Sequence, residues 1–375
     1  MTSRLPFVDL QAQRRRIGSR LDEAFARVLA HGQFILGPEV RELEGKLARF
    51  SGAKHCVTCA NGTDALLLPL MAWGIGPGDA VLVPSFTFVA SAEVVVLAGA
   101  TPVFVDVDRE SFNVTPESLV LGVRAAREAG LAPRVAMPVD LFGQPADFAG
   151  LDPVCRKYGL KILSDAAQSY GGGQGNRRVG SLAPVTSTSF FPSKPLGAYG
   201  DGGAIFTDDD DLNDVLRSVR MHGQGIDKYH NIRIGLNSRL DTMQAAILLE
   251  KLAILEDEIA ARDRVARRYS DGLADVCEVP RIAAGNASAW AQYTILVENR
   301  DAVAKALDAA GIPTAIYYPI PVHRQDGYRH FPVAKGGLPV SEELSGQVLS
   351  LPMHPYLEPA DQDRVIAAVR SAVGR

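Results

Sequence analysis

The chain has 375 residues, of which 47% are hydrophobic and 22% are charged, so its composition is that of a globular protein too long for one ordinary core. A formal net charge of −4 lacks the basic excess of proteins that bind nucleic acid, so we expect no nucleic-acid partner. No run of about 18 apolar residues predicts a membrane span, and the first residues lack a secretory signal, so we expect a cytoplasmic protein with no membrane partner.

The first elements along the chain are helical. Apolar residues at helical spacing predict one helix over residues 10–30 and a second over residues 39–50. From residue 55 onward, short apolar strands alternate with helical segments. We predict strands at residues 56–59, 80–83, 101–107, 135–141, 161–164, 187–191 and 204–207. This alternation indicates an α/β fold with a buried, mainly parallel central sheet.

Cys56 and Cys59 form a C-x-x-C pair inside the first predicted strand. Residues three apart on a strand point to opposite faces, and no second pair of metal ligands stands out elsewhere in the chain. We therefore expect buried free thiols and no metal site, in agreement with a reducing compartment.

The last third of the chain predicts a smaller α+β unit. A long helical stretch over residues 240–270 comes first. A strand at 293–297, a helix at 301–310, a strand at 314–318, a loop at 319–339 and a final helix at 359–373 follow. We expect a large domain over residues 1–250, with an amino-terminal helical arm, and a small carboxyl-terminal α+β domain over residues 251–375.

Two ionisable residues follow predicted strands. Asp165 ends the strand at 161–164, at the sheet edge where parallel α/β folds bind ligands, although it could instead cap a helix. Lys194 follows the strand at 187–191 and precedes a glycine-rich segment, which indicates close backbone approach. Most lysines are solvated surface groups, but a partly desolvated one has a lowered pKa and attacks carbonyl groups.

Other residues could bind an anion and a planar ring. Asn61-Gly62-Thr63 follows a strand and opens a helix, where backbone N–H groups attract phosphate, although Thr63 could be only a helix cap. Ser189 could add a hydroxyl to the same site. Phe88 could stack on a planar ring or could pack in the core.

These groups together fit one cofactor. Pyridoxal 5′-phosphate requires an acid for its ring nitrogen, a lysine for its aldehyde and an anion site for its phosphate. Gly62-Thr63, Asp165 and Lys194 supply all three. No G-x-G-x-x-G follows the first strand and no Walker-type G-K-[ST] is present, which argues against dinucleotide and P-loop sites.

The same residues lie in motifs that resemble the DegT/DnrJ/StrS family of pyridoxal-phosphate sugar aminotransferases. The motifs extend over essentially the whole chain, at residues 7–10, 32–40, 60–66, 165–169, 189–194, 200–204 and 237–241. The resemblance implies the fold type I architecture of aspartate aminotransferase, with a large and a small domain. It also implies a homodimer with shared active sites and glutamate as the amino donor.

The resemblance further implies a role for each matching residue. Lys194 would form a Schiff base with the cofactor and move the proton, and Asp165 would pair with the ring nitrogen. The remaining cofactor contacts would come from Gly62, Thr63, Phe88, Gln168, Ser189 and Asn237. Of these, Gln168 would bind the ring hydroxyl, Phe88 would stack on the ring, and Asn237 would come from the partner subunit.

Within the family, the chain resembles bacterial aminotransferases that act on UDP-2-acetamido-2-deoxy-3-oxo-glucuronate and serve O-antigen and lipopolysaccharide biosynthesis. The matching stretches include residues 318–321 and 351–356. By this resemblance the sugar nucleotide would contact Gly32, Phe34, Ser193, Arg239, Tyr317 and Tyr318. Phe34 and Tyr317 depart from the family pattern, in which tyrosine and histidine are usual at these positions.

Two more charged residues are candidates for the substrate site. Arg239 could bind the carboxylate of a uronic acid and of glutamate in turn, because guanidinium pairs with carboxylate through two hydrogen bonds. The alternative is a surface ion pair of little energetic value. His323 could also reach the substrate, or it could be a histidine whose hydrogen bonds are satisfied inside the protein.

Three other functions use the same scaffold. Amination at the 4-keto position of a 6-deoxy UDP- or dTDP-sugar would need only a different substrate pocket. A dehydratase is disfavoured because such members replace the lysine, and this chain keeps Lys194. A non-catalytic cofactor-binding regulator is disfavoured because no additional DNA-binding segment is visible.

Overall fold

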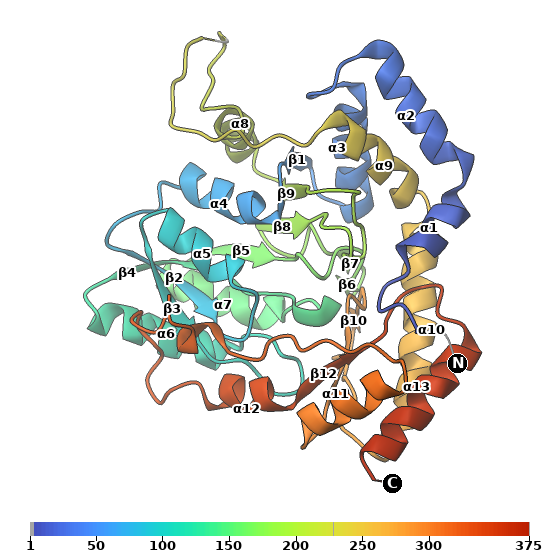
Figure 1. The fold of residues 1–375 in the computed structure, drawn as a ribbon. Coiled ribbons are helices and arrows are strands. Elements are labelled where there is room, and N and C mark those ends of the chain that lie inside the picture. Colours follow the sequence, from blue (N-terminus) through green and yellow to red (C-terminus); the bar gives the residue numbers. More distant parts are fainter. Residues whose placement is uncertain (1–3, 228, 375) are drawn as a thin grey trace.

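A computed structural model describes residues 4–227 and 229–374 and is built around a seven-stranded sheet (Figure 1). The strand order is β1-β9-β8-β5-β4-β2-β3. Strand β9 is antiparallel to both of its neighbours, and the other six strands run in one direction. The predicted mainly parallel sheet is therefore confirmed. The strands are β1 (His55–Cys59), β2 (Asp79–Pro84), β3 (Thr101–Val105), β4 (Ala132–Ala136), β5 (Lys161–Asp165), β8 (Val185–Ser189) and β9 (Gly203–Thr207).

Helices cover both faces of the sheet, and the alternation of side chains along β1 shows why. Val57 and Cys59 pack with the cluster under α4 (Gly62–Ala72) and α8 (Asp210–Val219). Cys56 packs on the other face, with α3 (Pro38–Ser51) and α9 (Thr242–Leu252). Successive strand residues point to opposite faces, so both thiols are buried and unpaired. Three further helices follow strands of the sheet: α5 (Ala90–Leu97), α6 (Pro116–Glu128) and α7 (Phe148–Tyr158).

The amino-terminal arm differs from its prediction. The single helix predicted over residues 10–30 is two helices, α1 (Leu10–Ile17) and α2 (Ser19–His31). Gly18 separates them with φ 66° and ψ −140°, a conformation that only glycine adopts readily. The break lets α2 pack against α9 while α1 turns toward the carboxyl-terminal part of the chain (Figure 1).

One predicted strand of the sheet is also wrong at its carboxyl end. The strand predicted over residues 135–141 is shorter, because β4 ends at Ala136 and a 3-10 turn occupies Leu141–Gly143. Pro138 has no N–H group to donate to a neighbouring strand, so regular pairing stops before it.

The carboxyl-terminal part forms a second hydrophobic cluster around a two-stranded sheet of β11 (Tyr293–Leu296) and β12 (Val348–Leu351). The helix predicted over 240–270 is two helices, α9 and α10 (Leu255–Leu273), because Ile254 leaves helical geometry with ψ 2°. The strand predicted over 314–318 is reduced to one bridge, Ala315 to Ser350, because the neighbouring strand β12 is short. The helices of this part are α11 (Arg300–Ala309), α12 (Pro339–Gln347) and α13 (Pro359–Ala372).

Smaller elements join the two clusters. A three-stranded sheet contains β6 (Gly173–Gln174), β7 (Arg177–Arg178) and β10 (Asn286–Ala287). Leu5, from the amino terminus, packs inside the carboxyl-terminal cluster. The domain division after residue 250 stays a prediction and falls near the end of α9. Within the described part of the chain, no helix combines the length and apolarity needed to cross a membrane.

Candidate active site

The candidate residues gather where parallel strands end. Strands β1, β2, β5 and β8 run in the same direction, so their carboxyl ends lie along one edge of the sheet. Gly62 and Phe88 follow β1 and β2, Asp165 and Ser189 end β5 and β8, and Lys194 follows β8. Ligand crevices of open α/β sheets lie at such an edge. Residues far apart in the sequence are thus brought to one place by strand direction.

The start of α4 forms a compact anion site with the end of β8. Asn61 caps the helix, since its Oδ1 accepts a hydrogen bond from the Asp64 N–H at 2.8 Å. The alternative role of Thr63 as the cap is therefore wrong. A Cβ at Gly62 would lie 2.6 Å from Cβ of Ser189, so glycine allows this close approach. Backbone N–H groups at a helix start next to a serine hydroxyl suit a phosphate group.

Asp165 is a buried carboxylate held from two sides. Its Oδ2 accepts a hydrogen bond from Ser91 Oγ at 2.8 Å, and its Oδ1 accepts one from the Ala167 N–H at 3.2 Å. Burial raises the pKa of Asp165, while these bonds and the charge of Lys194 lower it. A turn rather than a helix follows Asp165, so the alternative role as a helix cap is wrong.

Lys194 lies near enough to Asp165 for the charge of each to act on the pKa of the other. Its backbone N–H donates to the Phe191 carbonyl at 2.9 Å, which holds the start of the turn after β8. Burial lowers the pKa of the Lys194 amine, and the charge of Asp165 acts in the opposite direction. The lysine is half-buried rather than a solvated surface group. Because its pKa is lowered, a larger fraction of the Lys194 amine is uncharged, which makes the lysine a better nucleophile and base.

Aromatic side chains line an open cleft next to these residues. Phe88 is 56% exposed, so it is not a core residue, and its ring centre lies 6.1 Å from that of Tyr318. Gln168 accepts from the Phe142 N–H at 2.7 Å and donates to Tyr318 Oη at 3.2 Å. The cleft has a volume of about 530 Å³ and is lined by Thr87, Phe88, Val89, Tyr318, Pro319, Ile320, Arg324, Gln325 and Asp326. Tyr317 is half-buried next to Tyr318, with ring centres 5.7 Å apart.

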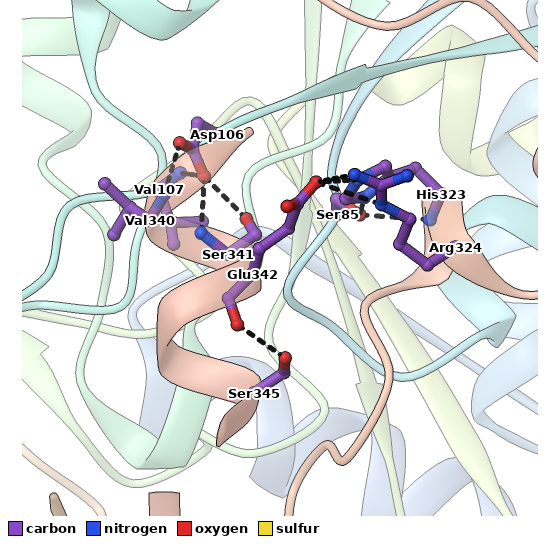
Figure 2. A network of polar contacts seen from close by, with 9 residues as sticks. All are labelled: Ser85, Asp106, Val107, His323, Arg324, Val340, Ser341, Glu342 and Ser345. Atoms are coloured by element: carbon purple, nitrogen blue, oxygen red, sulfur yellow. Dashed lines mark hydrogen bonds and ion pairs between the residues drawn. The ribbon is translucent and has the colours of Figure 1, made fainter. Parts of the chain in front are cut away.

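His323 has a different environment from the other predicted substrate residues. It is buried, and Figure 2 shows both ring nitrogens engaged within the protein. Nδ1 lies 2.7 Å from Ser85 Oγ, and Nε2 lies 3.1 Å from Oε1 of Glu342 on α12. The geometry favours the interpretation of a satisfied histidine. Its hydrogen bonds to Ser85 connect His323 to the segment that carries Phe88, three residues later.

The segment that carries Asn237 and Arg239 contacts the segments of two other candidates, Phe34 and Gly62. Thr242, three residues after Arg239, donates its N–H to the Phe34 carbonyl at 2.9 Å. Arg239 is half-buried, contacts Met221 Sδ at 3.9 Å and makes no ion pair with the described residues. Asn237 is exposed, and the neighbouring Ser238 accepts a hydrogen bond from the Ala60 N–H at 3.2 Å. Gly32 and Ser193 are exposed as well.

Sequence reasoning missed the groups behind Asp165. Thr87 Oγ1 lies 3.0 Å from Ser91 Oγ, so two buried hydroxyls stand in line with the carboxylate. Asp140 is fully buried, accepts from Ser169 Oγ at 2.7 Å, and has a pKa that burial raises to about 7. Ser91 and Asp165 are 74 positions apart, and no spacing signal could have paired them.

Comparison with known proteins agrees with this geometry. Residues 15–370 match the DegT/DnrJ/EryC1/StrS aminotransferase family. The chain belongs to this family. It is therefore an enzyme, a sugar aminotransferase, and pyridoxal 5′-phosphate is its cofactor. The buried acid, the lysine of lowered pKa and the anion site at α4 fit that cofactor.

Two relatives and one solved structure illustrate the similarity. The UDP-2-acetamido-2-deoxy-3-oxo-D-glucuronate aminotransferase of Pseudomonas aeruginosa is 50% identical over 97% of this chain and 99% of its own length. The UDP-N-acetyl-3-dehydro-alpha-D-glucosamine 3-aminotransferase of Acidithiobacillus ferrooxidans is 42% identical over 98% of this chain and 97% of its own. A family aminotransferase from Brucella abortus is 56% identical, covers 99% of this chain and 100% of its own, and superposes with a TM-score of 0.97. The fold type I architecture is therefore confirmed.

Proposed function

We propose that this enzyme transfers the amino group of glutamate to carbon 3 of UDP-2-acetamido-2-deoxy-3-oxo-glucuronate, in bacterial surface polysaccharide (O-antigen and lipopolysaccharide) biosynthesis. The observation that carries the proposal is the gathering of Asp165, Lys194 and the anion site of Gly62 and Ser189 at one sheet edge, beside an open cleft lined by Phe88 and Tyr318. The similarity to the Pseudomonas aeruginosa enzyme over nearly the full length of both chains supports the substrate.

The chemistry divides between the cofactor and the protein. When bound, pyridoxal phosphate supplies an electron sink for the carbon that loses its proton. Gly62, Thr63 and Ser189 would bind its phosphate, and the Asp165 carboxylate would accept a hydrogen bond from the protonated ring nitrogen. Lys194 would hold the cofactor through its aldehyde carbon, and its amine would move the proton at the reacting carbon.

The aromatic cleft orients the substrate. Phe88 would stack on the cofactor ring, and Tyr318, which accepts a hydrogen bond from Gln168, would line the sugar-nucleotide site next to it. Arg239 lacks an ion pair among the described residues, so its guanidinium can bind the carboxylate of glutamate and then that of the uronic acid. One cation thereby serves both half-reactions.

We also propose a cytoplasmic homodimer with shared active sites. Exposed apolar side chains gather on the segment between α8 and α9, which extends away from the rest of the subunit (Figure 1). Ile226 is fully exposed, Ile234 is 86% exposed and Ile232 is 51% exposed. Isolated monomers rarely expose such groups, so a second subunit that covers them explains the pattern. The same segment ends at Asn237, which would complete the partner's phosphate site.

The substrate can be tested directly. Purified holoenzyme would be incubated with glutamate and with 3-oxo or 4-keto sugars linked to UDP or dTDP, and the products identified by mass spectrometry. We expect amination of the UDP-3-oxo-glucuronate. Preferential amination of a 4-keto-6-deoxy sugar would support the alternative function. No change in the cofactor absorbance with any amino donor would instead favour a non-catalytic regulator.

A further inference from the structure

Lys194 also contributes to the wall of a second, much smaller cavity, of about 10 Å³. Two stretches singled out in the sequence, residues 7–10 and 351–356, contribute most of this wall, and the cofactor site uses neither. The cavity is lined by Val8, Asp9, Leu10, Gln13, Pro192, Lys194, Arg262, His354, Pro355 and Tyr356. The amino-terminal arm, the helix α10 and the carboxyl-terminal part of the chain therefore meet at the lysine.

Three polar side chains of this wall have atoms that no group in the described part of the chain satisfies. His354 is 2% exposed, and neither of its ring nitrogens has a hydrogen-bond partner among the described residues. Arg262 is 4% exposed, and its Nε is unpartnered in the same sense. Gln13 is 8% exposed, and its Oε1 is unpartnered. Buried polar groups of native proteins are bonded to protein or to ordered water, so three such groups around one cavity indicate a ligand.

The size of the cavity restricts that ligand to one water molecule. A water needs roughly 10–15 Å³ of such space and two to four polar partners, whereas a carboxylate or phosphate is larger. An anion is also not required, because Glu258 lies near Arg262 and its charge acts on that guanidinium. Gln13 Nε2 donates to Glu258 Oε2 at 2.9 Å, and Tyr356 Oη also bonds Glu258.

The donors and acceptors among the unpartnered atoms of this wall match those of a water molecule. Burial, and then the charge of Arg262, lower the pKa of His354 to about 4, so the imidazole is neutral near pH 7. A neutral imidazole has one donor and one acceptor nitrogen. Arg262 Nε offers a donor and Gln13 Oε1 an acceptor. Water is the small molecule that both donates and accepts.

We propose that this cavity binds one water molecule through His354, Arg262 and Gln13, and that the water positions the side chain of Lys194. The proposal rests on the assignment of Lys194 as the cofactor-binding lysine. The surrounding wall is firmly held, because the Met353 N–H donates to the Phe7 carbonyl at 3.2 Å and Glu258 joins Gln13 to Tyr356. A bound water completes this wall, so the lysine side chain has less freedom to turn away from the cofactor.

The first test is a high-resolution crystal structure of the wild-type holoenzyme. We expect one ordered water within hydrogen-bond distance of a His354 ring nitrogen and of Arg262 Nε or Gln13 Oε1. An empty cavity, or direct bonds between these side chains, would overturn the proposal. This measurement needs no variant and no substrate, so its result is independent of the proposed reaction.

The second test compares two variants of His354. Leucine removes both polar nitrogens, whereas glutamine keeps one donor and one acceptor. We expect the His354→Leu holoenzyme to lose the water and to release pyridoxal phosphate on dilution on the order of tenfold faster, because a Lys194 side chain that is less firmly positioned holds the cofactor less tightly. His354→Gln should stay within about twofold of the wild type, as should His330→Leu, a change at an exposed histidine.

The outcomes separate the parts of the proposal. Wild-type release of the cofactor from His354→Leu would refute the positioning role even if the water is present. If His354→Leu fails to fold, the wild-type crystal structure and His354→Gln still decide whether the water is there. Retained turnover in Lys194→Ala would refute the proposed role of the lysine, but not the water site itself.

Discussion

Asp165 and Lys194 show how burial prepares reacting groups. Burial raises the pKa of the carboxyl and lowers that of the amine, because each charged form loses water. The charge of each group also offsets part of the pKa shift of the other, because the two charges are opposite. A bound cofactor with a protonated ring nitrogen would hold Asp165 in its charged form. The charge states of Asp165 and Lys194 should therefore depend on whether the cofactor is bound.

Removal of the amine should abolish the reaction. In Lys194→Ala no side chain can bind the cofactor aldehyde or move the proton, so we expect turnover to fall by at least about 10⁴-fold. Steady-state assays with glutamate and the keto sugar would measure it. Lys46→Ala, a change at a lysine in an exposed ion pair, is the control and should keep full activity. Substantial turnover of Lys194→Ala would contradict the assigned role.

Ser91 should set the acid limit of activity. Its hydrogen bond favours the charged form of Asp165 and lowers the pKa of that carboxyl. Without the bond the pKa rises, so a smaller fraction of Asp165 is charged at a given acidic pH. We expect kcat/KM of Ser91→Ala to fall off at a higher pH than in the wild type, while Ser91→Thr keeps the wild-type profile. A profile of Ser91→Ala that coincides with the wild type would show that the bond has no effect.

Among the elements, the segment after β2 and helix α12 are joined by one histidine. His323 bonds Ser85 on one side and Glu342 on the other, and Glu342 also pairs with Arg324 at 2.6 Å (Figure 2). The Val322 N–H adds a bond to the Ser85 carbonyl at 2.9 Å. This junction fixes the segment that carries Phe88 relative to the segment that carries Tyr318. The width of the cleft therefore depends on it.

Loss of this junction should reduce stability. His323→Leu removes the ring nitrogen that the buried Ser85 hydroxyl contacts, while the backbone N–H of residue 323 still donates to that hydroxyl at 3.1 Å. The lost contact should cost roughly 1–3 kcal/mol, so we expect a lower thermal unfolding midpoint. Differential scanning fluorimetry of the holoenzyme would measure it, with His330→Leu as the exposed control. A raised KM for the sugar nucleotide with an unchanged midpoint would instead favour a direct substrate contact by His323.

At the scale of the whole molecule, the two subunits of the proposed dimer depend on the segment between α8 and α9. Replacement of Ile226 and Ile234 by glutamate would place two charges in the proposed interface, where desolvation opposes them. We expect a monomer by analytical ultracentrifugation and a loss of activity, because the partner's Asn237 would no longer reach the site. Leu121→Glu, on α6, is the control. A double variant that remains dimeric and active would contradict the proposed interface.

The sequence predicted the places of Asp165 and Lys194 relative to the strands more closely than it predicted the ends of the elements. Asp165 and Lys194 follow strands that hydrophobic patterning reveals, so their place at the sheet edge follows from strand direction. The breaks at Gly18 and Ile254 were not predicted, because helical periodicity continues on both sides of them. The strand predicted over 314–318 failed because the partner strand β12 is short, a fact of tertiary pairing.

Motifs and periodicity alone determined the α/β fold, the cofactor and the candidate lysine and acid, since each depends on local pattern and residue chemistry. Tertiary structure decided which groups stand behind them. Ser91 reaches Asp165 across 74 positions, and His323 reaches Ser85 across 238. His354 and Gln13, at opposite ends of the chain, line one cavity beside Lys194. Such contacts arise only when folding brings distant side chains together, so no local pattern in the sequence encodes them.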